Sequence, residues 1–258
     1  MLRRPVKPLP GSAPPHASRG YLATTLTETQ ADPTYRVPAA RRLWWRLLHA
    51  LCYVLFLPLY RFRMRGVTNV PMRGPLLVVA NHQSFLDPII VGLGIHKRPF
   101  FAMARKTLWD TKWVGWLIDS LNAVAVDQGA SDLKAMRQTL GVLKAGHALV
   151  LYPEGARSHD GEVQDFAPGL MLLVKRARPK VLPVGLDGAH EAWPRGKKYP
   201  CLHGRIAVSY GQPIDPDELL QLDNDAALAR IRDAVIAEKH AASQLRGKSP
   251  QMDADKHG

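Results

Sequence analysis

The sequence predicts an α/β fold, in which a mostly parallel mixed sheet is flanked by helices and preceded by an apolar helical segment. After Pro71, short apolar runs rich in Val and Leu alternate with stretches of helical periodicity, a pattern typical of parallel sheets with crossover helices. No linker rich in Pro, Gly or Ser interrupts the middle of the 258 residues. The sequence therefore predicts one domain with one core.

Short apolar runs mark the strands, because strands buried on both faces read as continuous stretches of Val, Leu and Ile. In chain order, the expected strands are residues 75–81, 98–104, 122–126, 148–153, 180–186 and 205–211. Pro153 ends the fourth run, since proline lacks the N–H that a sheet needs.

Stretches with helical periodicity separate these runs. The expected helices are residues 88–95, 108–118, 132–144, 169–177 and 215–239. The third has the clearest limits, because Ser131 is a favourable N-cap and Gly146 favours a C-terminal end. We expect the last one to be a single long, exposed, amphipathic helix.

The ends of the chain differ in composition from this domain. Residues 1–40 are rich in proline and lack the apolar core of a secretory signal, which predicts an unstructured arm. Residues 61–242 form the expected α/β domain, and residues 243–258 form a second unstructured tail. The two cysteines, Cys52 and Cys201, have no metal-ligand spacing, and their low number is typical of a reducing compartment.

Residues 41–60 between the arm and the domain are strongly apolar. The run Leu47–Tyr60 is broken only by His49, with arginines on both flanks and Trp44 and Trp45 at one edge. It is shorter than the ~20 residues of a spanning helix, but its aromatic and basic edges suit a lipid headgroup layer. We expect a membrane-docking helix, and the alternative is a helix buried in the core.

The net charge of +13 predicts a polyanionic partner, which could be nucleic acid, an anionic membrane or a phosphate-bearing substrate. No nucleic-acid-binding motif is recognisable in the sequence, so we expect no nucleic-acid partner.

Polar residues follow three of the expected strands at once: His82, the turn Arg105–Lys106, and Glu154. Ligands of open α/β sheets gather outside the carboxyl ends of the strands. We therefore expect these three segments to contribute to one site.

The first segment pairs His82 with Asp87, five residues later. If the histidine lies on the turn before a helix, the carboxylate can reach back to one ring nitrogen and leave the other to accept a proton. Such a pair can activate an alcohol as a nucleophile. Two other interpretations remain: Asp87–Pro88 is an ordinary helix start, and Ser84-x-x-Asp87 resembles a capping box.

The other two segments have the composition of a phosphate site. Gly155 lets the backbone approach a ligand, and Arg157 can bind a phosphate with two hydrogen bonds. The basic turn Arg105–Lys106 would also welcome a phosphate. The alternatives are a surface turn with an ion pair between Glu154 and Arg157, and a solvated basic turn.

Taken in order, these motifs resemble the glycerolipid acyltransferase family, in particular bacterial 1-acyl-glycerol-3-phosphate acyltransferases. The resemblance covers roughly residues 60 to 210. It rests on four matches, namely N-H-x4-D at Asn81–Asp87, the basic turn Arg105–Lys106, F-P-E-G-T-R-S at Tyr152–Ser158, and an apolar strand with an internal proline at Val181–Val184.

The resemblance implies direct transfer of a fatty acyl group from acyl-CoA or acyl carrier protein to the free hydroxyl of lysophosphatidic acid, which gives phosphatidic acid. His82 would be the general base and Asp87 its orienting partner. It also implies substrate-binding roles for Glu154, Gly155, Arg157, Ser158, Lys106 and Arg105. No metal and no cofactor beyond the acyl donor is expected, and the expected location is the cytoplasmic face of a bacterial inner membrane.

Three departures from the family pattern leave the acceptor open. Gln128 stands where the family often has an arginine, Ala156 replaces the usual threonine, and Phe166–Gly169 lacks the frequent lysine. Another lysophospholipid or a lyso-aminolipid is therefore an alternative acceptor. Alternatives of another class are a lipid hydrolase or thioesterase, although no G-x-S-x-G motif is present, and a non-enzymatic membrane adaptor.

Overall fold

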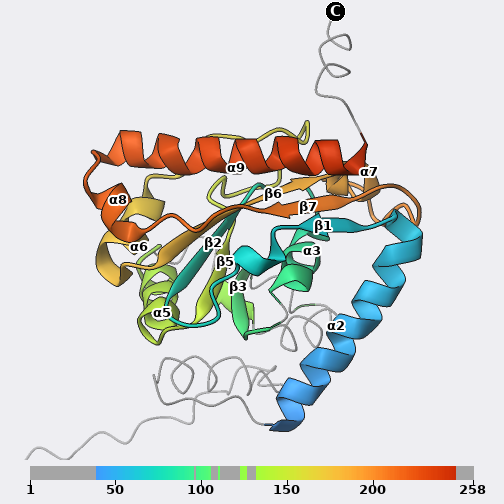
Figure 1. The fold of residues 1–258 in the computed structure, drawn as a ribbon, viewed down its shortest axis with the longest axis horizontal. Coiled ribbons are helices and arrows are strands. Elements are labelled where there is room, and N and C mark those ends of the chain that lie inside the picture. Colours follow the sequence, from blue (N-terminus) through green and yellow to red (C-terminus); the bar gives the residue numbers. More distant parts are fainter. Residues whose placement is uncertain (1–38, 96, 106–109, 111–122, 127–131, 248–258) are drawn as a thin grey trace, which may run out of the picture.

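The computed structural model of the protein describes residues 39–95, 97–105, 110, 123–126 and 132–247. In this part of the chain, seven strands form one sheet in the order β1-β7-β6-β2-β5-β3-β4 (Figure 1). The strands are β1 (Arg63–Arg65), β2 (Leu76–Ala80), β3 (Phe100–Arg105), β4 (Ala123–Val126), β5 (Ala148–Leu151), β6 (Lys180–Asp187) and β7 (Ala207–Tyr210). Every neighbouring pair is parallel except β6–β7, which confirms the mostly parallel α/β prediction.

Alternation along β2 divides the core into two layers, because successive side chains of a strand point to opposite faces. Val78 and Ala80 face the side covered by α3 (Asp87–Gly94) and α2 (Ala39–Tyr60). Leu77 and Val79 face the side covered by α5 (Asp132–Lys144), α6 (Gly169–Ala177), α8 (Pro216–Leu220) and α9 (Asn224–Arg246). All residues of β2 are buried, as expected of a central strand.

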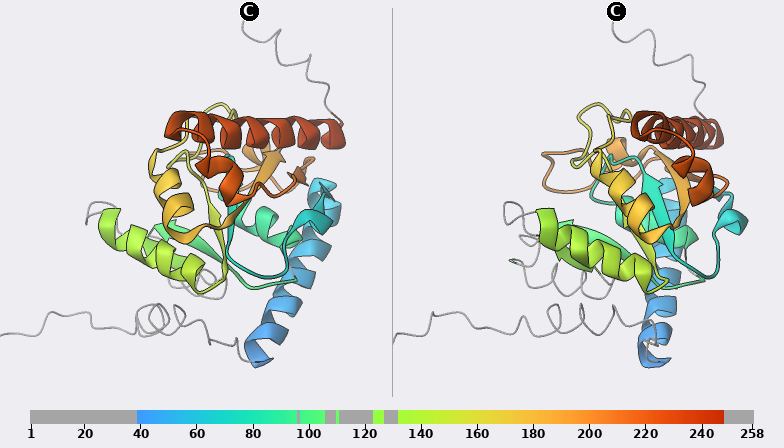
Figure 2. Two further views of the ribbon diagram at one scale, coloured as in Figure 1. Left: turned by 60° about the vertical axis from the view of Figure 1, so that its left-hand side comes forward. Right: turned by 90° about the vertical axis from the view of Figure 1, so that its left-hand side faces the viewer.

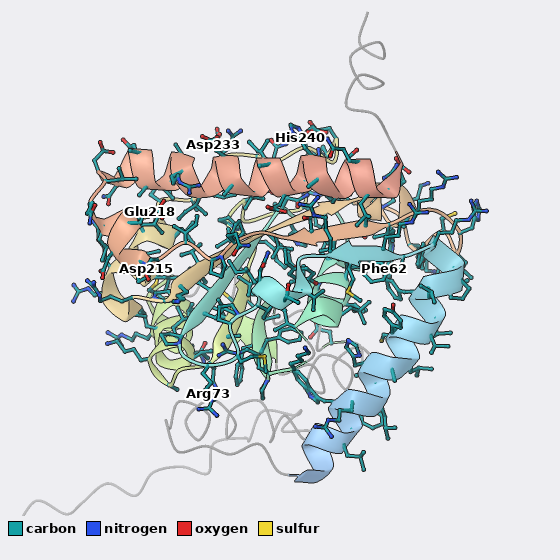
Figure 3. The ribbon with its side chains drawn as sticks, viewed as in Figure 1. Phe62, Arg73, Asp215, Glu218, Asp233 and His240 are labelled. Atoms are coloured by element: carbon teal, nitrogen blue, oxygen red, sulfur yellow. The ribbon has the colours of Figure 1, made fainter. Side chains whose placement is uncertain are left out.

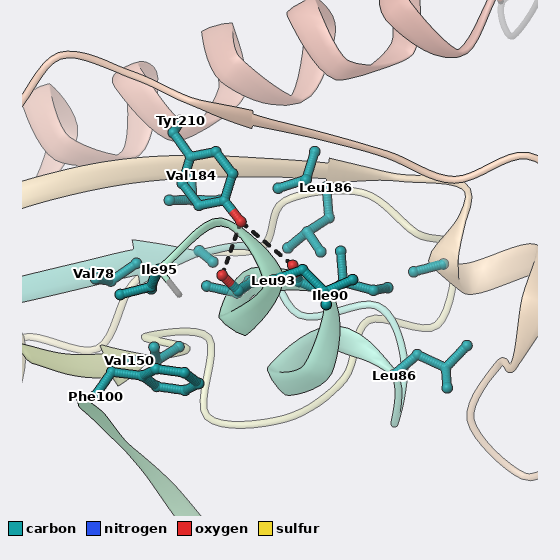
Figure 4. Packing of buried hydrophobic residues seen from close by; sticks show 14 of the residues in the cluster. Val78, Leu86, Ile90, Leu93, Ile95, Phe100, Val150, Val184, Leu186 and Tyr210 are labelled. Atoms are coloured by element: carbon teal, nitrogen blue, oxygen red, sulfur yellow. Dashed lines mark hydrogen bonds between the residues drawn. The ribbon is translucent and has the colours of Figure 1, made fainter. Parts of the chain in front are cut away.

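Tyr210 fixes α3 against the sheet from the end of β7. Its hydroxyl accepts a hydrogen bond from Gly94 N at 3.0 Å and donates to Val91 O at 2.8 Å. Figure 4 shows the hydroxyl directed at carbonyl oxygens of α3. A phenol that is fully buried needs such partners. The helix that begins at Asp87 is therefore held at both its apolar face and its carboxyl end.

The closing helical region differs from the prediction. The sequence predicts one exposed helix over residues 215–239, whereas the structure has two helices, and the second starts afresh at Asp223, whose carboxylate accepts from Ala226 N at 2.8 Å. α9 runs to Arg246, past the expected start of the tail at residue 243. It is amphipathic, with Asp233 and His240 on its solvent face (Figure 3) and Ile231 among its buried residues.

α9 lies unusually close to β6 because Gly185 has no side chain. A Cβ at this position would meet the backbone of Lys239 at 2.0 Å. The buried face of α9 therefore packs directly on the strand, and Lys239, itself almost fully buried, extends to form an ion pair with Glu162 at 2.5 Å.

α2 runs along one edge of the domain, with its N-terminal end farthest from the sheet (Figures 1 and 2). It contains the one helix segment of the described chain, Leu43–Tyr60, that is long and apolar enough to cross a membrane. Only 11% of that segment is buried in the protein, so the alternative of a core helix is wrong for most of its surface.

The two sides of α2 have different neighbours. The buried side carries Phe56 and Tyr60, and His49 donates from Nε2 to Leu93 O at 2.7 Å, which explains a histidine inside the apolar run. The opposite side, called here the outer face of α2, is exposed and apolar. It consists of Leu43, Leu47, Leu51, Val54, Leu55 and Leu57.

Short elements were missed by the sequence patterns. β1 has only three residues, two of them arginine, and α7 (Ala189–Ala192) has four. Several predictions lie outside the described residues: most of the helix over 108–118, the tail beyond residue 247, Lys106, Gln128 and nearly all of the N-terminal arm.

Candidate active site

The site begins where β2 ends, at residues 81–87, called here the His82 turn. Asn81, fully buried, donates from its amide to Leu186 O at 3.1 Å and accepts from Leu186 N at 2.8 Å. The side chain thus continues the pairing of β2 with β6 for one more step. These two hydrogen bonds fix the point at which His82 leaves the sheet.

His82 and Asp87 meet as the sequence predicts. His82 Nδ1 lies 2.8 Å from Asp87 Oδ2, and the imidazole is about one-fifth exposed, whereas the carboxylate is fully buried. Because a carboxylate only accepts hydrogen bonds, Nδ1 carries the hydrogen and Nε2 is left with a free electron pair. The arrangement presents a proton acceptor to whatever enters from solvent.

Asp87 makes only half of the capping box that the alternative interpretation proposes, because its carboxylate accepts from Ser84 N but the Ser84 hydroxyl does not accept from Asp87 N, and the N-cap of the helix is Leu86. Its Oδ2 accepts from the backbone N–H of Gln83 at 2.6 Å and of Ser84 at 2.7 Å, while Ser84 Oγ accepts from Leu86 N at 3.2 Å. The two interpretations are compatible, since one carboxylate both closes the helix start and orients the histidine. Two backbone donors hold the carboxylate in place whether or not the histidine is present.

Tyr152 covers one face of the histidine. The two rings are stacked, with centroids 4.2 Å apart and planes 19° from parallel. Burial, together with the negative charge of Asp87, raises the pKa of Tyr152 well above its ordinary value. The tyrosine is therefore uncharged, and its stacked ring limits rotation of the imidazole.

The loop after β5 also holds the backbone of His82. Its N–H donates to Glu154 Oε1 at 3.1 Å, and its carbonyl accepts from Ser158 N at 2.8 Å. Ser158 in turn accepts from Gly161 N with its hydroxyl at 3.1 Å. The structure thus brings two sequence motifs, separated by about seventy residues, into one unit.

Glu154 has an unusual environment for a carboxyl group. Burial raises the pKa of Glu154 to about 7, and the negative charge of Asp87 also raises it. Hydrogen bonds from the backbone of His82 and Gln164 act in the opposite direction and lower the pKa. Its contact with His82 is to the backbone rather than to the ring. Glu154 therefore positions the His82 turn and holds a proton through much of the acid pH range.

Arg157 lies at the rim of the site. Its guanidinium carbon is 3.5 Å from the centroid of the Phe85 ring, and Phe85 packs against Trp193 with centroids 5.1 Å apart. Stacking on an aromatic ring holds a guanidinium in place while its edge can still bind an anion. The arrangement suits an anionic group that enters beside His82.

The remaining predicted residues have less direct positions. Gly155 has a φ of +72° with open space beside it, so the turn needs glycine for its backbone conformation rather than for room. Arg105 ends β3 next to Val126, and Lys106 lies outside the described residues, so the basic turn stays a prediction. Among the residues that the structure describes, no group of three His, Cys, Asp or Glu could hold a metal ion.

Sequence reasoning missed three contributors. Tyr152 occupies the first position of the Y-P-E-G motif but was not recognised as a partner of His82, and Phe85 and Trp193 looked like ordinary apolar residues. Trp193 is joined to the His82 turn by a hydrogen bond from Ser84 Oγ to its carbonyl at 2.9 Å. The available sequence signal for Phe85 was an aromatic residue inside the N-H-x4-D motif.

Comparisons with known proteins show similarity to acyltransferases. A family model described as Acyltransferase matches residues 61–187. The chain is 27% identical over 173 residues to the chloroplastic 1-acyl-sn-glycerol-3-phosphate acyltransferase LPAT1 of Arabidopsis thaliana, covering 66% of this chain and 48% of that protein. It is 26% identical to the 1-acyl-sn-glycerol-3-phosphate acyltransferase of Streptococcus pneumoniae, covering 63% of this chain and 58% of that protein.

A solved structure has the same fold. The chain matches the crystal structure of the 1-acyl-sn-glycerophosphate acyltransferase PlsC from Thermotoga maritima with a TM-score of 0.67 at 24% identity, covering 89% of this chain and 91% of that one. In sequence, the chain spans about half the length of the curated relatives that it matches, from 46% to 58% for the first four.

Proposed function

We propose that the protein, whose residues 61–187 match the acyltransferase family model, transfers a fatty acyl group from acyl-CoA or acyl carrier protein to the free hydroxyl of lysophosphatidic acid. The product would be phosphatidic acid. The observation that carries the proposal is the pair His82–Asp87, in which Nε2 is free to accept a proton. The names of the relatives favour this acceptor.

The proposed reaction is a single transfer without an acyl-enzyme. His82 Nε2 accepts the proton of the acceptor hydroxyl as its oxygen attacks the thioester carbonyl. The carbon–sulfur bond then breaks, the proton passes from His82 to the leaving thiolate, and the products are the ester and the free thiol. Asp87 stabilises the imidazolium that forms between these two steps.

Arg157 is the proposed contact for the acceptor phosphate. Phe85 holds its guanidinium at the rim of the site, and a planar guanidinium can bind phosphate with two hydrogen bonds. The outer face of α2 is the proposed membrane-docking surface, since exposed Leu and Val at helical spacing lose their contact with water in a lipid layer. The proposed location is the cytoplasmic side of a bacterial inner membrane.

The test of the chemistry is His82→Ala, purified in detergent and assayed with a lysolipid acceptor and both acyl carriers. A positioned base contributes ~10²- to 10⁴-fold to rate, so we expect a loss of at least that order. His190→Ala is the matched control, because this partly buried histidine does not contact Asp87 and bonds to the carbonyl of His159 instead. Activity of His82→Ala within tenfold of the parent would contradict the mechanism.

Product analysis separates transfer from hydrolysis. We expect a new ester only when a lysolipid is present, and little free fatty acid when it is absent. A panel of lysophosphatidic acid, other lysophospholipids and a lyso-aminolipid identifies the acceptor. Free fatty acid formed at the same rate without acceptor would favour a thioesterase.

A further inference from the structure

A second exposed apolar surface lies between α7 and β7, in residues 194–205, called here the 194–205 loop. Tyr199 and Leu202 are 70% and 62% exposed, which places them among the most exposed large apolar side chains of the described chain. The loop is nevertheless well attached at its base. Cys201 N donates to Ala192 O at 2.7 Å, and Trp193 Nε1 donates to Lys197 O at 2.8 Å.

The charge of the loop is of one sign. Arg195, Lys197, Lys198 and Arg205 are all exposed, and the loop contains no Asp or Glu. Lys198 Nζ lies 5.3 Å from the centroid of the Tyr199 ring. An aromatic ring beside lysine, with a leucine nearby, is the combination that suits the headgroup layer of an anionic membrane.

The loop adjoins the proposed docking helix. Ile206, directly after the loop, donates its N–H to the carbonyl of Tyr60, the last residue of α2, at 2.9 Å. A Cβ at Gly204 would lie 3.8 Å from the Tyr60 ring. The exposed side chains of the loop and those at the end of α2, where Leu57 and Arg61 are exposed, therefore start from neighbouring backbone.

The base of the loop is also connected to Phe85 of the His82 turn and to Arg157. Trp193, which the loop holds through Lys197, packs against Phe85, and Phe85 supports Arg157. Phe85 is itself 41% exposed. A continuous series of contacts thus links the loop to the rim at which an anionic lipid headgroup would be bound.

We propose that the 194–205 loop is a second membrane contact, in which Tyr199 and Leu202 enter the headgroup layer of an anionic bilayer while the basic residues face the lipid phosphates. With α2, it would hold the entrance of the site against the bilayer. The part of this inference that concerns delivery of a lysolipid rests on the proposed function. The membrane contact itself does not.

The direct test is co-sedimentation of the full chain with vesicles of phosphatidylcholine, with and without phosphatidylglycerol. Tyr199→Ser/Leu202→Ser should weaken binding to both kinds of vesicle about tenfold, because two apolar side chains no longer leave water. Lys197→Glu/Lys198→Glu should weaken binding at least about tenfold on anionic vesicles and little on neutral ones, since each basic residue near an anionic surface contributes about fivefold.

Leu222→Ser is the matched control. This leucine is 42% exposed and lies before α9, at the other end of that helix from Arg205, so the substitution should leave vesicle binding unchanged. Vesicle binding of both loop variants equal to that of the control would overturn the proposal. This outcome does not depend on any enzymatic activity.

The second readout is acyl transfer to two presentations of the acceptor. With a long-chain lysolipid in anionic vesicles, Tyr199→Ser/Leu202→Ser should lose about fivefold or more in rate. With a short-chain lysolipid dissolved as a monomer, it should stay within about twofold, which also shows that the variant is folded. An equal loss with both acceptors would overturn the proposal. So would unchanged vesicle binding together with a loss confined to the acyl carrier protein donor, because the loop would then be a carrier-protein site.

Discussion

Around His82 the polar side chains are buried, whereas along the outer face of α2 the apolar side chains are exposed. In the His82 turn, Asn81, Gln83, Ser84 and Asp87 are each at most 1% exposed. On the outer face of α2, every leucine and valine is about half exposed or more. Both regions depart from the usual distribution of side chains, in opposite directions.

The two departures are stabilised differently. The buried polar groups find partners inside the protein, such as Leu186 for Asn81 and the 83–84 backbone for Asp87, so their positions are fixed before any ligand arrives. The exposed apolar side chains of α2 are mostly left uncovered by the described part of the chain, and they fit an external lipid layer. We propose chemistry for the first region and membrane attachment for the second.

The largest expected effect comes from Asp87→Asn. Asparagine keeps an amide oxygen that can accept from Nδ1, but it carries no negative charge, so the imidazolium loses most of its stabilisation and kcat should fall about 10²- to 10⁴-fold. The measurement is the steady-state rate of acyl transfer in detergent. A fall below fivefold would show that the pair is only structural.

Ser84→Ala is the control for the capping role of Asp87. It removes the hydroxyl that accepts from Leu86 N and donates to Trp193 O, but it leaves the contact between His82 and Asp87 intact. We expect about 1 kcal/mol less stability and a kcat within about threefold of the parent. A large loss of rate without a loss of stability would assign part of the chemistry to Ser84.

The second effect is on attachment. Leu47→Ser/Val54→Ser on the outer face of α2 should weaken vesicle binding about tenfold to a hundredfold, because two apolar side chains would no longer be transferred from water into the lipid layer. The rate in detergent should not change. Leu172→Ser, on an exposed position of α6, is the control, and an equal effect of this control on binding would remove α2 from the account.

The third effect is a pH dependence of stability from Glu154. Its pKa is about 7 in the folded protein against an ordinary value of 4.5, so the folded state binds more protons between these values. The free energy of unfolding from this group is therefore highest below pH 4.5 and falls as the pH rises to 7.

Glu154→Gln isolates that contribution, since glutamine does not titrate and its amide oxygen can still accept from His82 N. The stability of the parent relative to the variant should fall by about 2–3 kcal/mol from pH 4.5 to 8. Urea unfolding in detergent at a series of pH values measures it. A relative stability that is flat or rises over this window would contradict the assigned environment of Glu154.

The smallest effect is expected from the stack on His82. Tyr152→Leu removes an aromatic pair of about 0.5–1.5 kcal/mol, so kcat should fall roughly two- to tenfold. Tyr152→Phe keeps the ring and should stay within about twofold. Equal losses of kcat for both variants would show that the hydroxyl of Tyr152, and not its stacked ring, supports catalysis.

Much of this fold follows from local sequence patterns. Helices α5 and α6 lie where they were predicted, and the strands were placed within a few residues, because each is a strong periodic or apolar segment between turn residues. The break before α9 was missed, since a new N-cap at Asp223 inside a helical pattern resembles any exposed acidic residue. β1 is too short to form a pattern of its own and depends on pairing with β7.

The site was predictable only in part, for a physical reason. His82 and Asp87 are only five residues apart, so their pairing can be predicted from the local sequence. The stack of Tyr152 on His82 and the series from Trp193 through Phe85 to Arg157 join segments far apart in the chain. Such contacts depend on the sheet order, which no local pattern contains.

The most direct test of the division between chemistry and attachment compares two variants on one substrate in two forms. His82→Ala and Leu47→Ser/Val54→Ser are each assayed with the same long-chain lysolipid in detergent micelles and in anionic vesicles. We expect His82→Ala to lose at least about a hundredfold in both, and the α2 variant to lose activity only with vesicles. An α2 variant that is equally impaired in micelles, or a His82→Ala protein that stays active in either form, would contradict the account.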